Sequence, residues 1–144
     1  MTLAGSISAL LSANWTLAGD LATAKVRFSE GWYDSSFESF PQVTVSELVN
    51  PVGKFYGTST VDFYPRFLVN CWQTIPRGSS GTLEYSYAES MRREAARIIN
   101  ANRHGVAAFN IVSLEDEGTP HHELDETPRV LRYEITVFAV RTLS

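Results

Sequence analysis

The chain has 144 residues, of which 44% are apolar and 19% are charged, and its formal net charge at pH 7 is −4. This length and composition predict one globular domain with its own core. A negatively charged chain has no overall positive field to hold a nucleic acid. The single cysteine, Cys71, excludes an intrachain disulfide and a cysteine-rich zinc site. The N-terminal sequence lacks the basic region of a signal peptide and no apolar run reaches membrane-spanning length, so we expect a soluble protein made in the cytoplasm.

The first part of the chain predicts a helix followed by strands. Apolar residues at helical spacing indicate a short helix over residues 3–14, with a buried stripe formed by Leu3, Ile7, Leu10 and Leu11. Alternation of polar and apolar residues predicts strands over residues 24–29 and 42–48. Residues 31–40 have no periodicity and indicate a loop rich in aromatic residues: Trp32, Tyr33, Phe37 and Phe40.

The strongest strand pattern covers residues 60–75. Alternation places one set of side chains on a common face: Val61, Phe63, Phe67, Val69 and Cys71. Pro65 cannot donate a ladder hydrogen bond, so it predicts a sheet edge or a bulge. We interpret Cys71 as a small core residue and not as a reactive thiol. Glycine and proline predict a hairpin tip over residues 50–59, and residues 76–81 predict a linker.

Residues 86–104 predict the main helix. Ser86 and Glu89 match a capping box, and Gly105 is a suitable stop. The buried stripe is Tyr87, Met91, Ala95, Ile98 and Ile99. The polar residues are Arg92, Arg93 and Arg97, with Glu89 and Glu94 among them. We interpret this side as a salt-bridged surface, with a binding face for an anionic partner as the alternative.

Two strands are predicted in the last part of the chain, over residues 106–114 and 129–140. The second has one apolar face, formed by Leu131, Tyr133, Ile135, Val137 and Ala139. The order of elements predicts a single α+β domain over residues 1–144. Its sheet is expected to be antiparallel or mixed, with four to five strands, and the N-terminal helix and the long amphipathic helix pack on it.

Two adjacent histidines, His121 and His122, stand in an acidic stretch. The acids are Glu115, Asp116, Glu117, Glu123, Asp125 and Glu126. Neighbouring side chains of an extended segment point opposite ways, whereas a zinc ion needs three or four converging ligands. We therefore predict an acidic, solvated loop and no metal site, and these two histidines are the candidates if a metal is bound.

No motif of a known reaction is present. The chain has no nucleophile elbow, no phosphate-binding glycine loop and no helical H-E-x-x-H pair. Carboxylate pairs such as Asp125 and Glu126 are typical of solvated surface. We therefore expect no enzymatic activity and no cofactor.

Several segments together carry a resemblance to a known family. They are the helix ending "LLSANW", the strand in "FPQVTVSEL", the strand "DFYPRFLVNCW", the helix "YAESMRREAARIINANR" and the closing "LDETPRVLRYEITVFAV". In this order, and above all in the pairing of "IINANR" with "RVLRYEITV", the chain resembles the tail-terminator, or tail-completion, proteins of long-tailed phages and related proviruses. The resemblance runs over most of the chain.

The resemblance implies a structural virion protein without catalytic residues. Such proteins are small α+β proteins that assemble as a hexameric ring on the end of the tail tube, stop its growth and join it to the neck. The implied partners are further copies of the chain, the tail tube protein and a neck or head-completion protein. DNA would pass through the channel without specific binding, and the protein would be located in the tail of the virion.

The resemblance also gives hypotheses for individual residues. Copies would meet through one basic and one acidic set: Arg92, Arg93 and Arg97 against Glu123, Asp125 and Glu126. A second set would face the tube or the channel: Lys54, Glu115, Asp116 and Glu117. Acids suit a channel for DNA because like charge prevents sticking.

Three alternatives remain. One, from the same class, is another head–tail connector or neck protein. A second is a small-molecule-binding module with an apolar pocket lined by Trp32, Tyr33, Phe37, Trp72 and Tyr133. A third is a metal-dependent enzyme that uses His121, His122 and the neighbouring acids.

Overall fold

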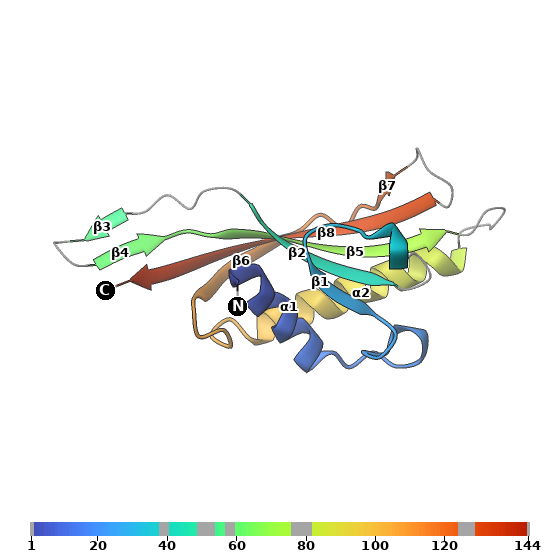
Figure 1. The fold of residues 1–144 in the computed structure, drawn as a ribbon, viewed down its shortest axis with the longest axis horizontal. Coiled ribbons are helices and arrows are strands. Elements are labelled where there is room, and N and C mark those ends of the chain that lie inside the picture. Colours follow the sequence, from blue (N-terminus) through green and yellow to red (C-terminus); the bar gives the residue numbers. More distant parts are fainter. Residues whose placement is uncertain are drawn as a thin grey trace.

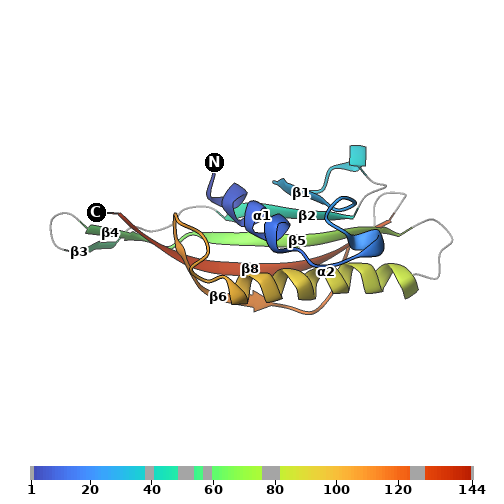
Figure 2. The ribbon, with the colours of Figure 1, turned by 90° about the horizontal axis from the view of Figure 1, so that it is seen from below.

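The computed structural model describes residues 2–37, 41–48, 54–56, 60–75, 82–123 and 129–143. Their eight strands form one hydrogen-bonded sheet. The two α-helices lie side by side on one face of this sheet, as Figures 1 and 2 show from two directions. The predicted α+β class is therefore confirmed, with more strands than the four or five expected. No helix among these residues is both long enough and apolar enough to cross a membrane.

The helices and strands have the following bounds. The helices are α1 Leu3–Asn14 and α2 Thr82–Ala101, with short 3-10 turns η1 Gly19–Leu21 and η2 Ser35–Phe37. The strands are β1 Arg27–Glu30, β2 Gln42–Leu48, β3 Lys54–Tyr56, β4 Thr60–Phe63, β5 Arg66–Ile75, β6 Asn110–Asp116, β7 His121–Glu123 and β8 Arg129–Leu143.

Strand β8 organises the sheet because it pairs along both of its edges. On one edge it pairs with β5 and then with β4, and on the other with β6 and β7. Beyond β5 lie β2 and then β1, and the pairing of β1 with β2 is the parallel one among the described strands. The sheet is therefore mixed, which is one of the two forms that the sequence predicted.

The predicted strand over residues 60–75 is interrupted at Pro65 without a change of register. Phe63 pairs with Arg141 and Arg66 with Phe138, so three steps on one strand match three on the other. The Pro65 carbonyl still accepts a hydrogen bond from the Ala139 N–H at 3.0 Å. Pro65 therefore does not cause a bulge, which was one of the two predicted outcomes. It removes one donor from the ladder and leaves the path of the strand intact.

The core lies between the sheet and the two helices. From the sheet come Val43, Val45, Phe67, Val69, Cys71, Ile135 and Val137, all fully buried, and from the helices come Ile7, Leu11, Met91, Ala95, Ile98 and Ile99. Periodicity placed these residues inside, whereas four others that it also placed inside are only half-buried: Leu3, Leu10, Phe63 and Tyr87. Thr2 caps α1, because its Oγ1 accepts a hydrogen bond from the Gly5 N–H at 2.9 Å.

Two predictions about α2 are wrong. The helix begins at Thr82, so Ser86 lies inside it and does not form a capping box. Residues 82–85 contain no glycine or proline that would delay the start. In addition, Glu94 is buried and not on a solvated face.

Parts of the acidic stretch form strands, although a solvated loop was predicted there. Glu115 and Asp116 belong to β6, and His121 to Glu123 form β7, so the described part of the acidic stretch is not one continuous loop. The predicted strand over residues 106–114 starts at Asn110 and runs on to Asp116. The predicted linker over residues 76–81 lies outside the described residues, as do residues 50–53 and 57–59 of the predicted hairpin tip and residues 124–128.

Candidate functional site

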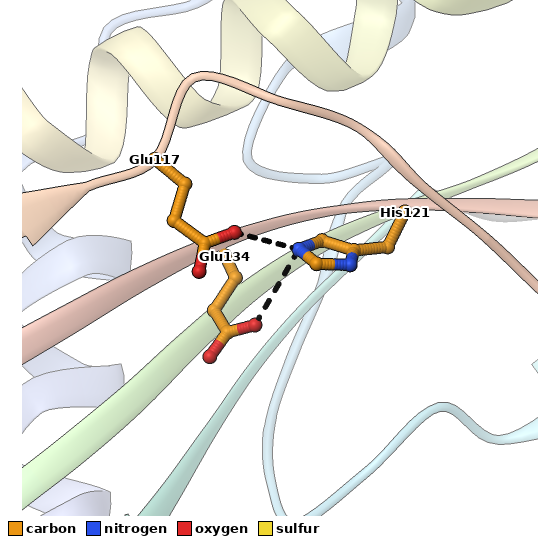
Figure 3. Close-up of side chains that lie close together, drawn as sticks. All are labelled: Glu117, His121 and Glu134. Carbon is orange, nitrogen blue, oxygen red and sulfur yellow. Dashed lines mark hydrogen bonds and ion pairs between the residues drawn. The ribbon is translucent and has the colours of Figure 1, made fainter.

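A histidine and two carboxylates meet at the edge of the sheet where β7 pairs with β8. His121 Nε2 lies 2.7 Å from Glu117 Oε2 and 3.7 Å from Glu134 Oε2, and Figure 3 shows both carboxylates directed at this one ring nitrogen. One ligand atom from each residue lies within 4.8 Å of the other two. The side chains are partly accessible, with 52% of Glu117, 37% of His121 and 20% of Glu134 exposed.

An irregularity in the sheet edge brings Glu117 to this place. Between Asp116 and His121 the edge advances five residues, while their partners on β8, Ile135 and Arg132, are three residues apart. Two residues are therefore in excess, and the connection between β6 and β7 must bulge outward. Gly118 adopts a φ of +68° in this connection, a conformation that other residues rarely adopt. The Gly118 N–H donates to Asp116 Oδ1 at 3.2 Å, which closes the turn after Glu117.

The face of the sheet without helices carries a polar network that holds Glu134. Arg132 Nη1 donates to Glu134 Oε2 at 2.8 Å and to Asn70 Oδ1 at 3.1 Å. The guanidinium also lies over the rings of Trp32 and Trp72, at 5.2 and 5.5 Å from their centroids. Arg132 is thus fixed by two hydrogen bonds and two aromatic rings, and it orients the carboxylate of Glu134.

Asn70 is fully buried within this network. Its Oδ1 accepts from Arg132, whereas its Nδ2 has no hydrogen-bond partner among the described residues. A buried donor without an acceptor carries a cost of about 1–3 kcal/mol. The presence of a buried asparagine here is therefore better explained by its role in orienting Arg132 than by a direct contribution to stability.

Cys71 lacks the surroundings of a reactive thiol. It is fully buried in the core between sheet and helices. Burial raises the pKa of the Cys71 thiol to about 12, because the thiolate loses its hydration there. The interpretation of this cysteine as a core residue agrees with its position.

The arginines of α2 make contacts within the subunit. Arg92 pairs with Asp116 across the helix–sheet boundary and has 13% of its side chain exposed. Arg93 is 71% exposed and pairs with Glu89 at 2.8 Å, and Arg97 is 51% exposed and pairs with Glu94 at 2.6 Å. Arg93 and Arg97 therefore present most of the basic surface that was predicted to meet a neighbouring copy.

The predicted acidic surfaces are only partly described. Asp116 faces the helix side and is bound to Arg92, while Glu115 and Glu117 have exposed side chains. The backbones of Lys54, His122 and Glu123 are placed in strands, and the register pairs His122 with Leu131. Their side chains, together with Asp125 and Glu126, lie outside the described residues.

The aromatic residues proposed for a ligand pocket do not line one cavity. Trp72 and Tyr133 lie on opposite faces of the sheet, because Trp72 pairs with Arg132 and Tyr133 with Cys71. Trp32 and Tyr33 pack on Trp72, with ring centroids 4.8 and 5.4 Å away. A groove of about 320 Å³ exists elsewhere, at the start of α1, and it is lined by Thr2, Ala4, Glu30, Gly31, Val45, Ser46 and Glu47.

Glu94 joins α2 to the segment after α1. Its Oε2 accepts from both the N–H and the Oγ1 of Thr16 at 2.6 Å, and its Oε1 accepts from Arg97 Nε at 2.6 Å. Burial by itself raises the pKa of this carboxyl, but the hydrogen bonds from Arg97 and Thr16 outweigh burial and leave the pKa below its ordinary value of 4.5.

Replacing Glu94 with glutamine should therefore destabilise the protein in a pH-dependent way. At pH 7 we expect a loss of about 1.5–3 kcal/mol in the free energy of unfolding, because charge-assisted hydrogen bonds are replaced. A lowered folded-state pKa contributes stability above the unfolded-state pKa and loses it as pH falls through the folded-state value. The difference between the two proteins should thus shrink below about pH 4.5. Urea unfolding between pH 3 and pH 7 measures this difference in the free energy of unfolding. A difference that stays constant over this range would contradict the lowered pKa of Glu94.

Comparison of the chain with models of protein families finds no match, and comparison with curated proteins finds no match either.

Proposed function

We propose that this chain is a structural protein of a phage tail, which assembles as a ring of copies on the end of the tail tube and joins it to the neck. The order of sequence segments that resembles the tail-terminator proteins motivates the proposal. The observation that carries it is a ribbon that extends from the body of the subunit. We define the ribbon as β3, β4 and the end of β8 from Arg141 to Leu143.

The ribbon extends beyond the layer of helices. In Figures 1 and 2 it leaves the body at the end that also holds the C-terminus. Strand β3 packs on β4, and β4 packs on β8, while neither has a substantial contact with α1 or α2. Small isolated sheets are stable when an apolar face is covered by further structure. A neighbouring copy in a ring would supply that cover.

The ribbon is also an insertion in an otherwise simple hairpin. Leu48, the last residue of β2, pairs directly with Arg66, the first residue of β5. A short turn would be enough to join these two strands, yet the chain makes an excursion through residues 49–65 instead. An excursion that the body does not need for its own pairing is best explained by a role in assembly.

The test is the mass of the native protein over a wide concentration range, with electron microscopy of the same samples. Closed rings of about six subunits are expected, because head-to-tail contacts between identical copies close into cyclic assemblies. A monomer at every concentration would contradict self-assembly of the ring.

Removal of the ribbon should abolish the ring and leave the subunit folded. In this variant an Asn-Gly turn replaces residues 49–65, and the chain ends after Val140, because residues 141–143 pair with β4. We expect a cooperative thermal transition and a monomer by sedimentation. Inserting the same Asn-Gly pair after Leu48 with the ribbon retained is the matched control and should preserve the ring. Rings formed by the shortened chain would show that the ribbon is not the contact.

A further inference from the structure

We propose that Glu117, His121 and Glu134 bind a divalent transition-metal ion of the zinc class, which fastens the connection between β6 and β7 to β8. This inference does not depend on the proposed role in a phage tail. It concerns the edge of the sheet shown in Figure 3, and Figure 1 places β7 at the end of the molecule opposite to the ribbon.

The arrangement around His121 is unusual for a simple ion pair. Both carboxylates approach the same ring nitrogen, Nε2, at 2.7 and 3.7 Å. A ring nitrogen carries at most one hydrogen and can donate it along one direction. An ion placed between the nitrogen and the two oxygens would instead contact all three atoms, while Glu134 Oε2 keeps its hydrogen bond from Arg132 Nη1 through its other lone pair.

The separations suit a metal after small side-chain movements. Zinc binds imidazole nitrogen and carboxylate oxygen at about 2.0–2.2 Å, so two of its tetrahedral ligand atoms are roughly 3.4 Å apart. The distance from His121 Nε2 to Glu134 Oε2 is already 3.7 Å. Glu117 lies on the exposed connection and has to withdraw its Oε2 by less than about 1 Å from the 2.7 Å it has now.

The donor set favours zinc over calcium or magnesium. One imidazole and two carboxylates are ligands for zinc and its neighbours in the first transition row, whereas calcium and magnesium take oxygen ligands. Three protein ligands leave a fourth position for water. The two carboxylates and Arg132 together carry a charge of −1, so binding of a divalent cation changes the net charge of this cluster to +1, of the same magnitude.

The surrounding residues already hold one ligand in place. Glu134 is fixed by Arg132, and Arg132 is fixed by Asn70 and by the rings of Trp32 and Trp72. Partners of this kind orient metal ligands and commonly change metal affinity by 10–100-fold when they are removed. Glu134 and His121 come from adjacent paired strands, so the backbone fixes both of them and Glu117 alone has to adjust.

Zinc titration of the tag-free, full-length protein tests the proposal. Calorimetry and native mass spectrometry should give one zinc ion per chain, and the thermal midpoint should rise with zinc concentration because the ion binds the folded state. Cobalt should give a visible absorption band of a low-coordinate site. His121→Gln, Glu117→Gln and Glu134→Gln should each weaken zinc binding at least tenfold.

The neighbouring histidine supplies the matched control. His122 is adjacent in sequence and pairs with Leu131 instead of Arg132, so His122→Gln should bind zinc as the unmodified chain does. Circular dichroism of each variant checks folding, and Glu117→Gln changes only the connection outside the strands. The proposal is overturned if no stoichiometric binding occurs, if His121→Gln binds zinc unchanged, or if His122→Gln loses binding to the same extent.

Discussion

Replacing Trp72 with alanine should lower the free energy of unfolding by about 3–5 kcal/mol, the range for removing a large buried aromatic side chain. Trp72 has 1% of its surface exposed although it lies on the face of the sheet that no helix covers. Trp32, Tyr33 and Arg132 enclose its ring. Its Nε1–H donates to Thr44 Oγ1 at 2.8 Å. Urea unfolding at constant pH measures the loss as a shift of the transition midpoint.

Two further variants separate packing from hydrogen bonding at Trp72. Thr44→Val removes the acceptor and leaves the indole N–H buried, which should cost about 1–3 kcal/mol. Trp32→Ala removes a ring that is 52% exposed and should cost clearly less than Trp72→Ala. Equal losses in the free energy of unfolding for Trp72→Ala and Trp32→Ala would mean that the buried residues around Trp72 do not form a second core on this face.

The face around Trp72 also shows where periodicity is a sufficient guide and where it is not. Alternation assigned Thr44, Asn70 and Trp72 to the side away from the main core, and the sheet places them there. It did not predict that all three are buried. Their cover includes residues 31–37, whose position depends on contacts distant in sequence, such as the hydrogen bond between Tyr33 and Thr74. Local patterns carry no information about such contacts.

The candidate site was only half visible in the sequence. The pair of adjacent histidines identified His121 as a candidate ligand. The side chains of His121 and His122 were expected to diverge, and the two residues pair with different residues of β8. The described carboxylates that lie beside His121 are nevertheless those of Glu117 and Glu134, and Glu134 is 13 positions further along the chain. Glu134 joins the site through the register of β7 on β8. That register depends on the two excess residues after Asp116, which no alternation pattern reveals.

Replacing Asp116 with alanine should lower the free energy of unfolding by roughly 3 kcal/mol, the lower end of the range for breaking a buried ion pair. Asp116 lies on the helix side of β6 and is hydrogen-bonded to Arg92 of α2, with 21% of its side chain exposed. The guanidinium of Arg92 also lies 5.4 Å from the centroid of the Tyr133 ring. Removing the carboxylate leaves this cation largely shielded from water, with Glu89 at 3.7 Å as its remaining acidic partner.

A double-mutant cycle distinguishes the loss of the pair from the burial of an uncompensated charge. Arg92→Met keeps most of the volume and removes the charge, so the double variant Arg92→Met, Asp116→Ala should cost less than the sum of the single changes, by about 1 kcal/mol or more. Arg93→Ala is the exposed control on the same helix and should cost under about 1 kcal/mol, because its pair with Glu89 is screened by water. Additive single and double changes at Arg92 and Asp116 would show that the two residues do not act as a pair. The contact between α2 and β6 would then depend on its apolar residues alone.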